Sequence, residues 1–136
     1  MPAEFEHQCL LFQWARNLEP RFPSLKLLHA IPNGGVRNIV VARKLKAAGT
    51  RAGVPDICLP VAPKGLSFHG LYIELKRPEK GTVSKAQQWW LDRLLEQGYR
   101  AVVCKGWIEA AHEIAYYLDI PVIYWPRRAA DLKVVR

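Results

Sequence analysis

Hydrophobic side chains recur with a helical period in four stretches of the chain. In the first stretch, Leu11, Ala15 and Leu18 fall on one face of the predicted helix. The strongest helical pattern follows Ser84, a candidate N-cap, because Gln87 stands three residues later in the position of a capping-box partner. A glycine, which commonly ends a helix, follows the second and third stretches. The pattern predicts helices over residues 3–18, 37–48, 84–97 and 107–118.

Shorter apolar runs between these helices are typical of β-strands. Proline, glycine and asparagine separate the runs, and the two middle runs flank a loop that suggests a hairpin. Residues 122–125 could add a further strand near the C-terminus. The remaining pattern predicts strands over residues 25–31, 56–61, 71–75 and 99–105. Helices that follow strands in this way predict one α/β domain with a mixed sheet.

Composition narrows the class of protein. The chain has 136 residues and 50% hydrophobic content, which is enough for one domain with a core. It has no apolar stretch of membrane-spanning length and no signal-like start, so we expect a soluble, cytoplasmic protein that is not secreted. The three cysteines form no C-x-x-C pair, which predicts reduced, buried thiols. No glycine-rich phosphate loop is present, so no nucleotide cofactor is expected.

The positive charge of the chain is unevenly placed. The net charge is +8, and the segment from residue 20 to 55 carries no acidic residue. Such a surface attracts polyanions, so the sequence predicts contacts with the phosphates of a nucleic acid. A solvated basic face without a partner is the alternative. The basic residues of this segment are Arg21, Lys26, Arg37, Arg43, Lys44, Lys46 and Arg51.

Two acids and a lysine occupy positions at which they can meet. Asp56 begins one predicted strand, and Glu74 and Lys76 are two residues apart on the next, so both side chains leave the same face. If these strands pair, Asp56 and Glu74 can converge on one hard cation such as Mg²⁺, and the Leu75 carbonyl could add a ligand. Lys76 would then lie beside the metal and the attacking water. The alternative is an ordinary ion pair on a half-exposed strand.

The first predicted helix carries an acid in an unusual place. Glu4 is in line with the apolar face, where a buried carboxylate is costly unless it is paired or bound to a metal. Glu6 falls on the polar side instead. The alternative is a carboxylate that only favours the helix dipole from the first turn.

Several motifs occur together in an order that resembles a known family. They are I31-P-N-G-G-V-R37, G53-V-P-D-I57, Y72-I-E-L-K-R77 and V83-S-K-A-Q87, with Glu4 and Gln8 on the helix before them. In this combination the chain resembles the virus-type replication-repair nuclease (VRR-NUC) domain of the PD-(D/E)xK superfamily, over about residues 3–115. The resemblance implies a restriction-endonuclease-like α/β fold, with a central mixed sheet flanked by helices. We expect a nuclease domain over residues 1–120 and a C-terminal extension over 121–136.

The resemblance also implies a role for each matching residue. Asp56 and Glu74 match the metal-binding acids, and Lys76 matches the catalytic lysine. Glu4 matches a helix acid that supports the metal site, with Glu6 as the alternative. Gln87 matches a glutamine that could orient the lysine or a substrate phosphate, although capping alone would explain it. The matching loop near the DNA backbone comprises Asn33, Gly34, Gly35 and Arg37.

Together these matches imply a metal-dependent, structure-selective DNA endonuclease that uses Mg²⁺, with Mn²⁺ able to substitute. We expect no further DNA-binding domain, so the chain resembles stand-alone members. These look like homodimers that cut branched DNA in repair, such as four-way (Holliday) junctions or flaps. Trp89, Trp90 or the tail around Trp125 could supply an interface, although Trp90 and Trp107 are expected in the core. The alternatives are a sequence-specific restriction-type nuclease and a non-catalytic nucleic-acid-binding module on the same fold.

Overall fold

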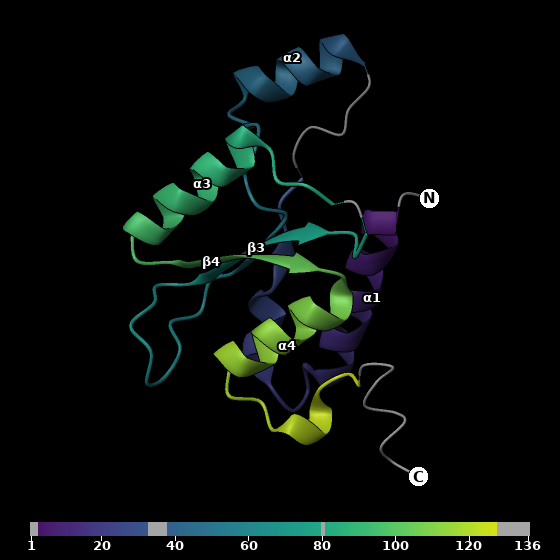
Figure 1. Cartoon of the computed structure of the whole chain (residues 1–136), viewed down its shortest axis with the longest axis vertical. Helices are drawn as coiled ribbons and strands as arrows, with labels where there is room; N and C mark the ends of the chain where they lie inside the picture. The colour runs from purple at the N-terminus through teal and green to yellow at the C-terminus, as the bar shows by residue number, and fades with distance from the viewer. Residues whose placement is uncertain (1–2, 33–37, 80, 128–136) are drawn as a thin grey trace.

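The computed structural model describes residues 3–32, 38–79 and 81–127. Helices and strands are interspersed along the chain (Figure 1). The α-helices begin and end close to the predicted positions, and Asn38 starts the second one by accepting a hydrogen bond from the Val40 amide at 2.9 Å. The helices are α1 (Ala3–Leu18), α2 (Ile39–Ala47), α3 (Lys85–Glu96) and α4 (Trp107–Tyr117). The strands are β1 (His29–Ala30), β2 (Ile57–Leu59), β3 (Leu71–Lys76) and β4 (Arg100–Lys105).

The four strands form one mixed sheet in the order β1-β2-β3-β4. β2 and β3 pair antiparallel, as the predicted hairpin requires, and β1 pairs antiparallel with β2. β3 and β4 are parallel, and α3 makes the crossover between them. The predicted α/β class with a central mixed sheet is confirmed.

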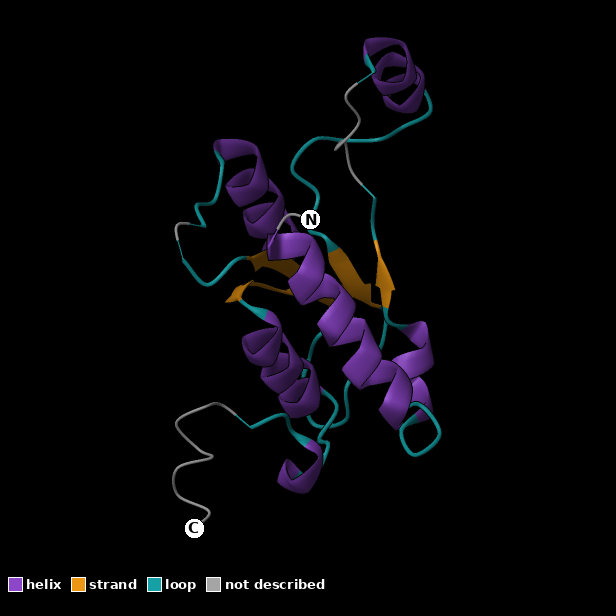
Figure 2. Cartoon of the chain, turned by 90° about the vertical axis from the view of Figure 1, so that its right-hand side faces the viewer, coloured by secondary structure: helices purple, strands orange, loops and turns teal. Residues whose placement is uncertain are grey.

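Helices cover both faces of this sheet (Figures 1 and 2). The main core lies between the sheet and the pair α1 and α4, where Leu11 and Ile114 pack against Ile73 and Leu75 of β3. A smaller cluster lies under α3 and includes Leu91 and Leu94. Because side chains alternate along a strand, Glu74 and Lys76 lie on the face of β3 opposite to Ile73 and Leu75. Glu74 and Lys76 therefore face α3.

One predicted strand forms only in part, and another does not form. Residues 25–27 belong to a 3₁₀ helix (η1, Pro23–Leu27), and of residues 25–31 only His29–Ala30 pair with β2. Proline at the start of η1 favours a helical turn, and burial of both Leu25 and Leu28 fits the three-residue repeat of a 3₁₀ helix. Residues 122–125 add no strand either: they form η2 (Val122–Tyr124), whose last carbonyl accepts a hydrogen bond from Trp14 Nε1 at 3.0 Å.

Several local predictions have clear outcomes. Ser84 caps α3 in a complete capping box with Gln87, as predicted. Cys58 and Cys104 are buried, but Cys9 is exposed, because it points away from the apolar face of α1. Trp90 and Trp107 are half-buried against the two core clusters.

α2 contributes no buried residue and stands away from the sheet (Figure 1). Its exposed apolar side chains are Ile39, Val40, Val41 and Leu45. In the part of the chain that the structure describes, no helix is both long enough and apolar enough to cross a membrane.

Candidate active site

The sheet brings Asp56 and Glu74 together. Ile57 pairs with Ile73 across β2 and β3, so Asp56 lies opposite the next residue of β3, which is Glu74. Asp56 Oδ2 accepts a hydrogen bond from the Leu75 amide at 2.8 Å, while the Asp56 carbonyl accepts one from Ile31 at 2.7 Å. The first hydrogen bond orients the Asp56 carboxylate, and the second fixes its backbone beside β1.

Glu74 is a buried acid with an unsatisfied oxygen. Its side chain is 1% exposed, and Oε1 has no hydrogen-bond partner among the described residues. Burial, a side-chain hydrogen bond with Asp56 and the negative charges of Asp56 and Glu4 raise the pKa of Glu74 to about 9, although the Lys76 charge opposes the rise. Without a cation, Glu74 therefore keeps its proton well above the pH at which an ordinary glutamate loses it.

Lys76 is fixed by the helix that covers its face of the sheet. Its side chain is 7% exposed, and Nζ donates a hydrogen bond to Gln87 Oε1 at 3.0 Å. The same oxygen accepts a hydrogen bond from the Ser84 amide at 2.9 Å. The two roles considered for Gln87, cap and lysine partner, are therefore filled by one atom at once.

Two glycines outside the set of predicted site residues allow this packing. A Cβ on Gly53 would lie 2.6 Å from the Ala86 carbonyl carbon, and Gly53 has a positive φ of 89°. A Cβ on Gly81 would lie 2.8 Å from Cβ of Lys76. Gly53 thus lets the segment before Asp56 cross the first turn of α3. Only the tertiary contacts reveal these requirements.

The first turn of α1 faces the same end of the sheet. The Glu4 charge contributes to the raised pKa of Glu74, whereas that of Glu6 does not. Further along α1, His7 Nδ1 accepts a hydrogen bond from the Trp107 amide at 2.9 Å and so caps α4, whose N-cap, Gly106, has no side chain to do so. No sequence pattern indicates this interaction, because its partners are distant along the chain.

The chain matches known proteins at the level of family and fold. The family model described as the VRR-NUC domain matches residues 2–107. The chain belongs to the VRR-NUC family. A solved structure described as a VRR_NUC domain protein is similar to it, with a TM-score of 0.73 and 28% sequence identity, over 88% of this chain and 91% of that one. No curated protein matches the chain in sequence.

The VRR-NUC site presents oxygen atoms that suit a hard cation. Glu74 Oε1 is buried without a partner among the described residues, and Asp56 shares its surroundings. Since the Leu75 amide points to Asp56, the Leu75 carbonyl leaves β3 on the same side. Mg²⁺ commonly takes one or two carboxylates and keeps several waters, so these residues fit it. Within the described ranges, no three His, Cys, Asp or Glu side chains lie close enough to hold a metal together, so Glu4 does not join the two acids as a direct neighbour.

The predicted DNA-binding residues fall into two groups. Four basic side chains are exposed on α2 or just after it: Arg43, Lys44, Lys46 and Arg51. The matching loop of Asn33, Gly34, Gly35 and Arg37 lies outside the described residues. The first group places positive charge on an arm, residues 38–51, which includes α2 and stands away from the sheet (Figure 2).

Proposed function

We propose that this VRR-NUC domain is a Mg²⁺-dependent DNA endonuclease that hydrolyses phosphodiester bonds, with Mn²⁺ able to replace Mg²⁺. The observation that carries the proposal is the pairing of Asp56 with Glu74, whose buried oxygen has no partner in the described part of the chain, beside a lysine that Gln87 holds in place. A structural ion pair joins an acid to a base, whereas this site places a second acid beside a buried one and so raises the pKa of Glu74. Two acids brought together in this way suit a divalent cation.

The residues divide the work of hydrolysis between them. Asp56, Glu74 and the Leu75 carbonyl would hold the cation, which when bound supplies charge neutralisation and a more acidic water. Lys76, held close to Glu74 by Gln87, would present a positive charge to the attacking water and the scissile phosphate. Glu4 adds negative charge close to Glu74 and so favours a divalent cation over a proton at the pair.

We further propose that the substrate is branched DNA, such as a four-way junction or a flap, and that two copies act as a homodimer. One site cuts one strand, so symmetric cleavage of a junction needs two sites related by a twofold axis. The exposed basic residues of α2 suit phosphate contacts, which position a duplex without reading its bases. A DNA-processing enzyme of this kind fits the cytoplasm of a bacterial or phage-infected cell.

Cleavage of labelled DNA tests the proposal. A four-way junction, a 5′ flap and plain duplex would be incubated with Mg²⁺, Mn²⁺ or EDTA. We expect metal-dependent cutting of the branched substrates, and a loss of about a hundredfold or more in Lys76→Ala with binding retained. Lys105→Ala is the matched control, because Lys105 pairs with Lys76 in register on β4 but is exposed.

The outcomes separate the rival functions. Binding without cutting under any metal would make the chain a non-catalytic module. Cutting at one fixed sequence in plain duplex would indicate a restriction-type enzyme instead. Full cutting by Lys76→Ala would remove the lysine from the mechanism.

A further inference from the structure

An open groove lies between α3 on one side and, on the other, the end of α2 with the segment that follows it. Its lining includes Leu45, Lys46, Thr50, Arg51, Trp89 and Trp90. Two aromatic rings and an aliphatic side chain thus form its apolar surface, and two cations stand beside them. None of these residues belongs to the proposed catalytic site, so the groove has no role in the chemistry already described.

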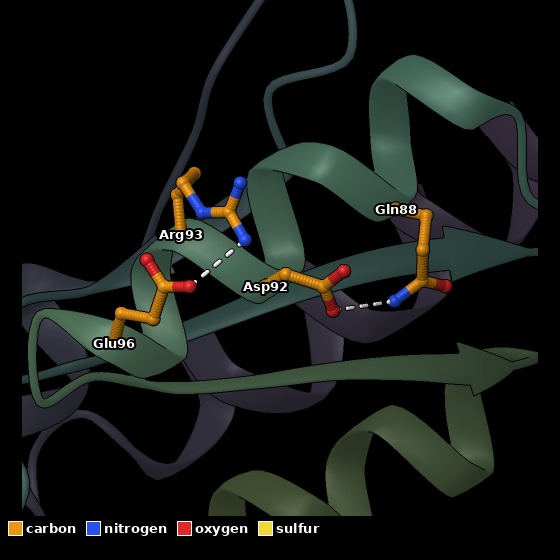
Figure 3. A network of polar contacts seen from close by, with 4 residues as sticks. All are labelled: Gln88, Asp92, Arg93 and Glu96. Atoms are coloured by element: carbon orange, nitrogen blue, oxygen red, sulfur yellow. Dashed lines mark hydrogen bonds and ion pairs between the residues drawn. The ribbon is translucent and has the colours of Figure 1, made fainter.

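Trp89 presents a fixed and exposed indole at this groove. Its side chain is 54% exposed, although a tryptophan on a helix normally buries most of its surface. The Trp90 ring stands nearly perpendicular to it, with centroids 5.7 Å apart. The Arg93 guanidinium lies 5.5 Å from the Trp89 centroid and is itself held by Glu96 at 2.8 Å (Figure 3). The indole is therefore ordered before any ligand arrives.

The groove is lined in part by Ala52 and Gly53, in the segment that leads to the candidate active site. Trp90 Nε1 donates a hydrogen bond to the Ala52 carbonyl at 3.1 Å, and Gly53 packs against Ala86 of α3. Both contacts fix the segment that leads directly to Asp56. Gln87, which holds Lys76, lies one turn before Trp90 on the same helix. A DNA strand at the metal-binding acids would thus pass close to the groove.

The charge of the residues that line the groove indicates which class of ligand it would bind. Lys46 and Arg51 line the groove, and Arg43 and Lys44 are exposed on the same arm. No acidic residue occurs from residue 20 to 55. An aromatic surface with a cationic rim matches the two parts of a nucleotide, a flat base and a phosphate. An apolar protein partner would need no such rim, and a paired duplex would offer no free base.

We propose that this groove binds an unpaired nucleobase, which stacks on Trp89 while Lys46 and Arg51 contact its flanking phosphates. The inference rests on DNA being the substrate of the proposed nuclease. It supplies a source of selectivity for branched DNA, because flaps and junction centres expose bases that plain duplex keeps stacked.

Binding measured without cleavage tests the inference. The Lys76→Ala protein in EDTA would be titrated into two fluorescent DNAs, a duplex with a single-stranded flap containing 2-aminopurine and a fully paired duplex. Adding Trp89→Ala should weaken flap binding about fivefold or more, since a stacked base contributes about 1–3 kcal/mol. It should leave duplex binding unchanged and abolish the 2-aminopurine quenching. Trp89→Phe should restore most of the affinity, because it keeps an aromatic face.

Leu95→Ala is the matched control, since Leu95 is another exposed apolar residue of α3 that does not line the groove. Equal weakening for both DNAs, or none for either, would overturn the inference. A fall in sedimenting mass on Trp89→Ala would also overturn it, by showing that a second copy of the chain covers the groove. Flap binding that depends on Trp89 in a protein that never cuts would instead uphold the groove and reject the nuclease.

Discussion

At the scale of single residues, the distinctive feature is the pair of acids Asp56 and Glu74. The pKa of Glu74 is raised to about 9, so Glu74 stays protonated at neutral pH unless a cation binds. Asp56 is anchored by the Leu75 amide, and Glu74 is buried beside it with one oxygen unpartnered among the described residues. Lys76 offsets only part of this effect on the pKa of Glu74, and its ammonium hydrogen-bonds to Gln87. Without a cation, the folded protein therefore keeps a proton on Glu74. A divalent cation bound there would bring two positive charges in place of that one.

This arrangement predicts an unusual pH dependence of stability. Glu74 binds its proton more tightly in the folded than in the unfolded chain, because its pKa rises from 4.5 to about 9. Its contribution to stability is full below pH 4.5 and is lost as the pH rises through about 9. We expect the thermal midpoint in EDTA to fall between pH 6 and pH 9 by about several degrees. Mn²⁺ should restore it most at the alkaline end, because it replaces the proton.

Glu74→Gln supplies the control for this pH series. The amide has the shape of the acid but no proton to lose, so the variant should show a flatter midpoint between the two pH values and little response to Mn²⁺. A wild-type thermal midpoint that rises with pH in EDTA would contradict the raised pKa of Glu74.

The convergence of the candidate site residues at one end of the sheet was predictable from the sequence, whereas the contacts that hold them there were not. The P-D and E-x-K spacing predicted Asp56, Glu74 and Lys76, because the parity of a strand and a hairpin bring them to one end. The caps and close packing join residues far apart in sequence, as His7 and Trp107 do. No local periodicity encodes such a pair.

At the scale of elements, α3 organises the site from one side. Its first turn holds Lys76 through Gln87, and its Ala86 receives the segment that carries Asp56. The predictions from sequence were wrong where apolar runs were interpreted as strands, at η1 and η2. Both runs carry apolar side chains, and an apolar run alone does not distinguish a short strand from a helical turn.

Gly53→Ala tests the close approach between that segment and α3. The added methyl would meet the Ala86 backbone, and the positive φ of Gly53 adds strain. We expect a loss of about 1–3 kcal/mol in the free energy of unfolding, together with weaker Mn²⁺ binding as Asp56 shifts. Chemical denaturation and calorimetric titration measure the two effects. Gly65→Ala is the control, because Gly65 has a φ of 80° with nothing within 4 Å of the added carbon; it should cost strain alone. Equal Mn²⁺ affinity in both variants would contradict the positioning role.

At the scale of the whole molecule, the exposed basic residues and the candidate catalytic groups lie on different elements of the fold. The acids and the lysine belong to the rigid sheet, while the basic residues of α2 occupy an arm without buried side chains. A helix that buries nothing in its own chain gains little from packing, so its position depends on what it meets. On our proposal, that partner is the DNA backbone.

Charge reversal on this arm gives the corresponding prediction. Arg43→Glu with Lys44→Glu should weaken DNA binding and reduce the slope of log affinity against log salt by about one for each phosphate that is no longer neutralised. Fluorescence anisotropy over a salt series measures both quantities. The same reversal at Lys64 and Arg127 is the control, because both are exposed and neither belongs to α2. An unchanged slope in the α2 variant would place the DNA elsewhere on the surface.

The shared oxygen of Gln87 makes the start of α3 and the position of Lys76 thermodynamically coupled. Unwinding of the first helical turn withdraws the acceptor from the ammonium, and a substrate that draws the ammonium away removes one anchor of that turn. Such coupling is reciprocal, so each event favours the other by the same free energy. The stability of the first turn of α3 would then depend on whether Lys76 contacts the substrate.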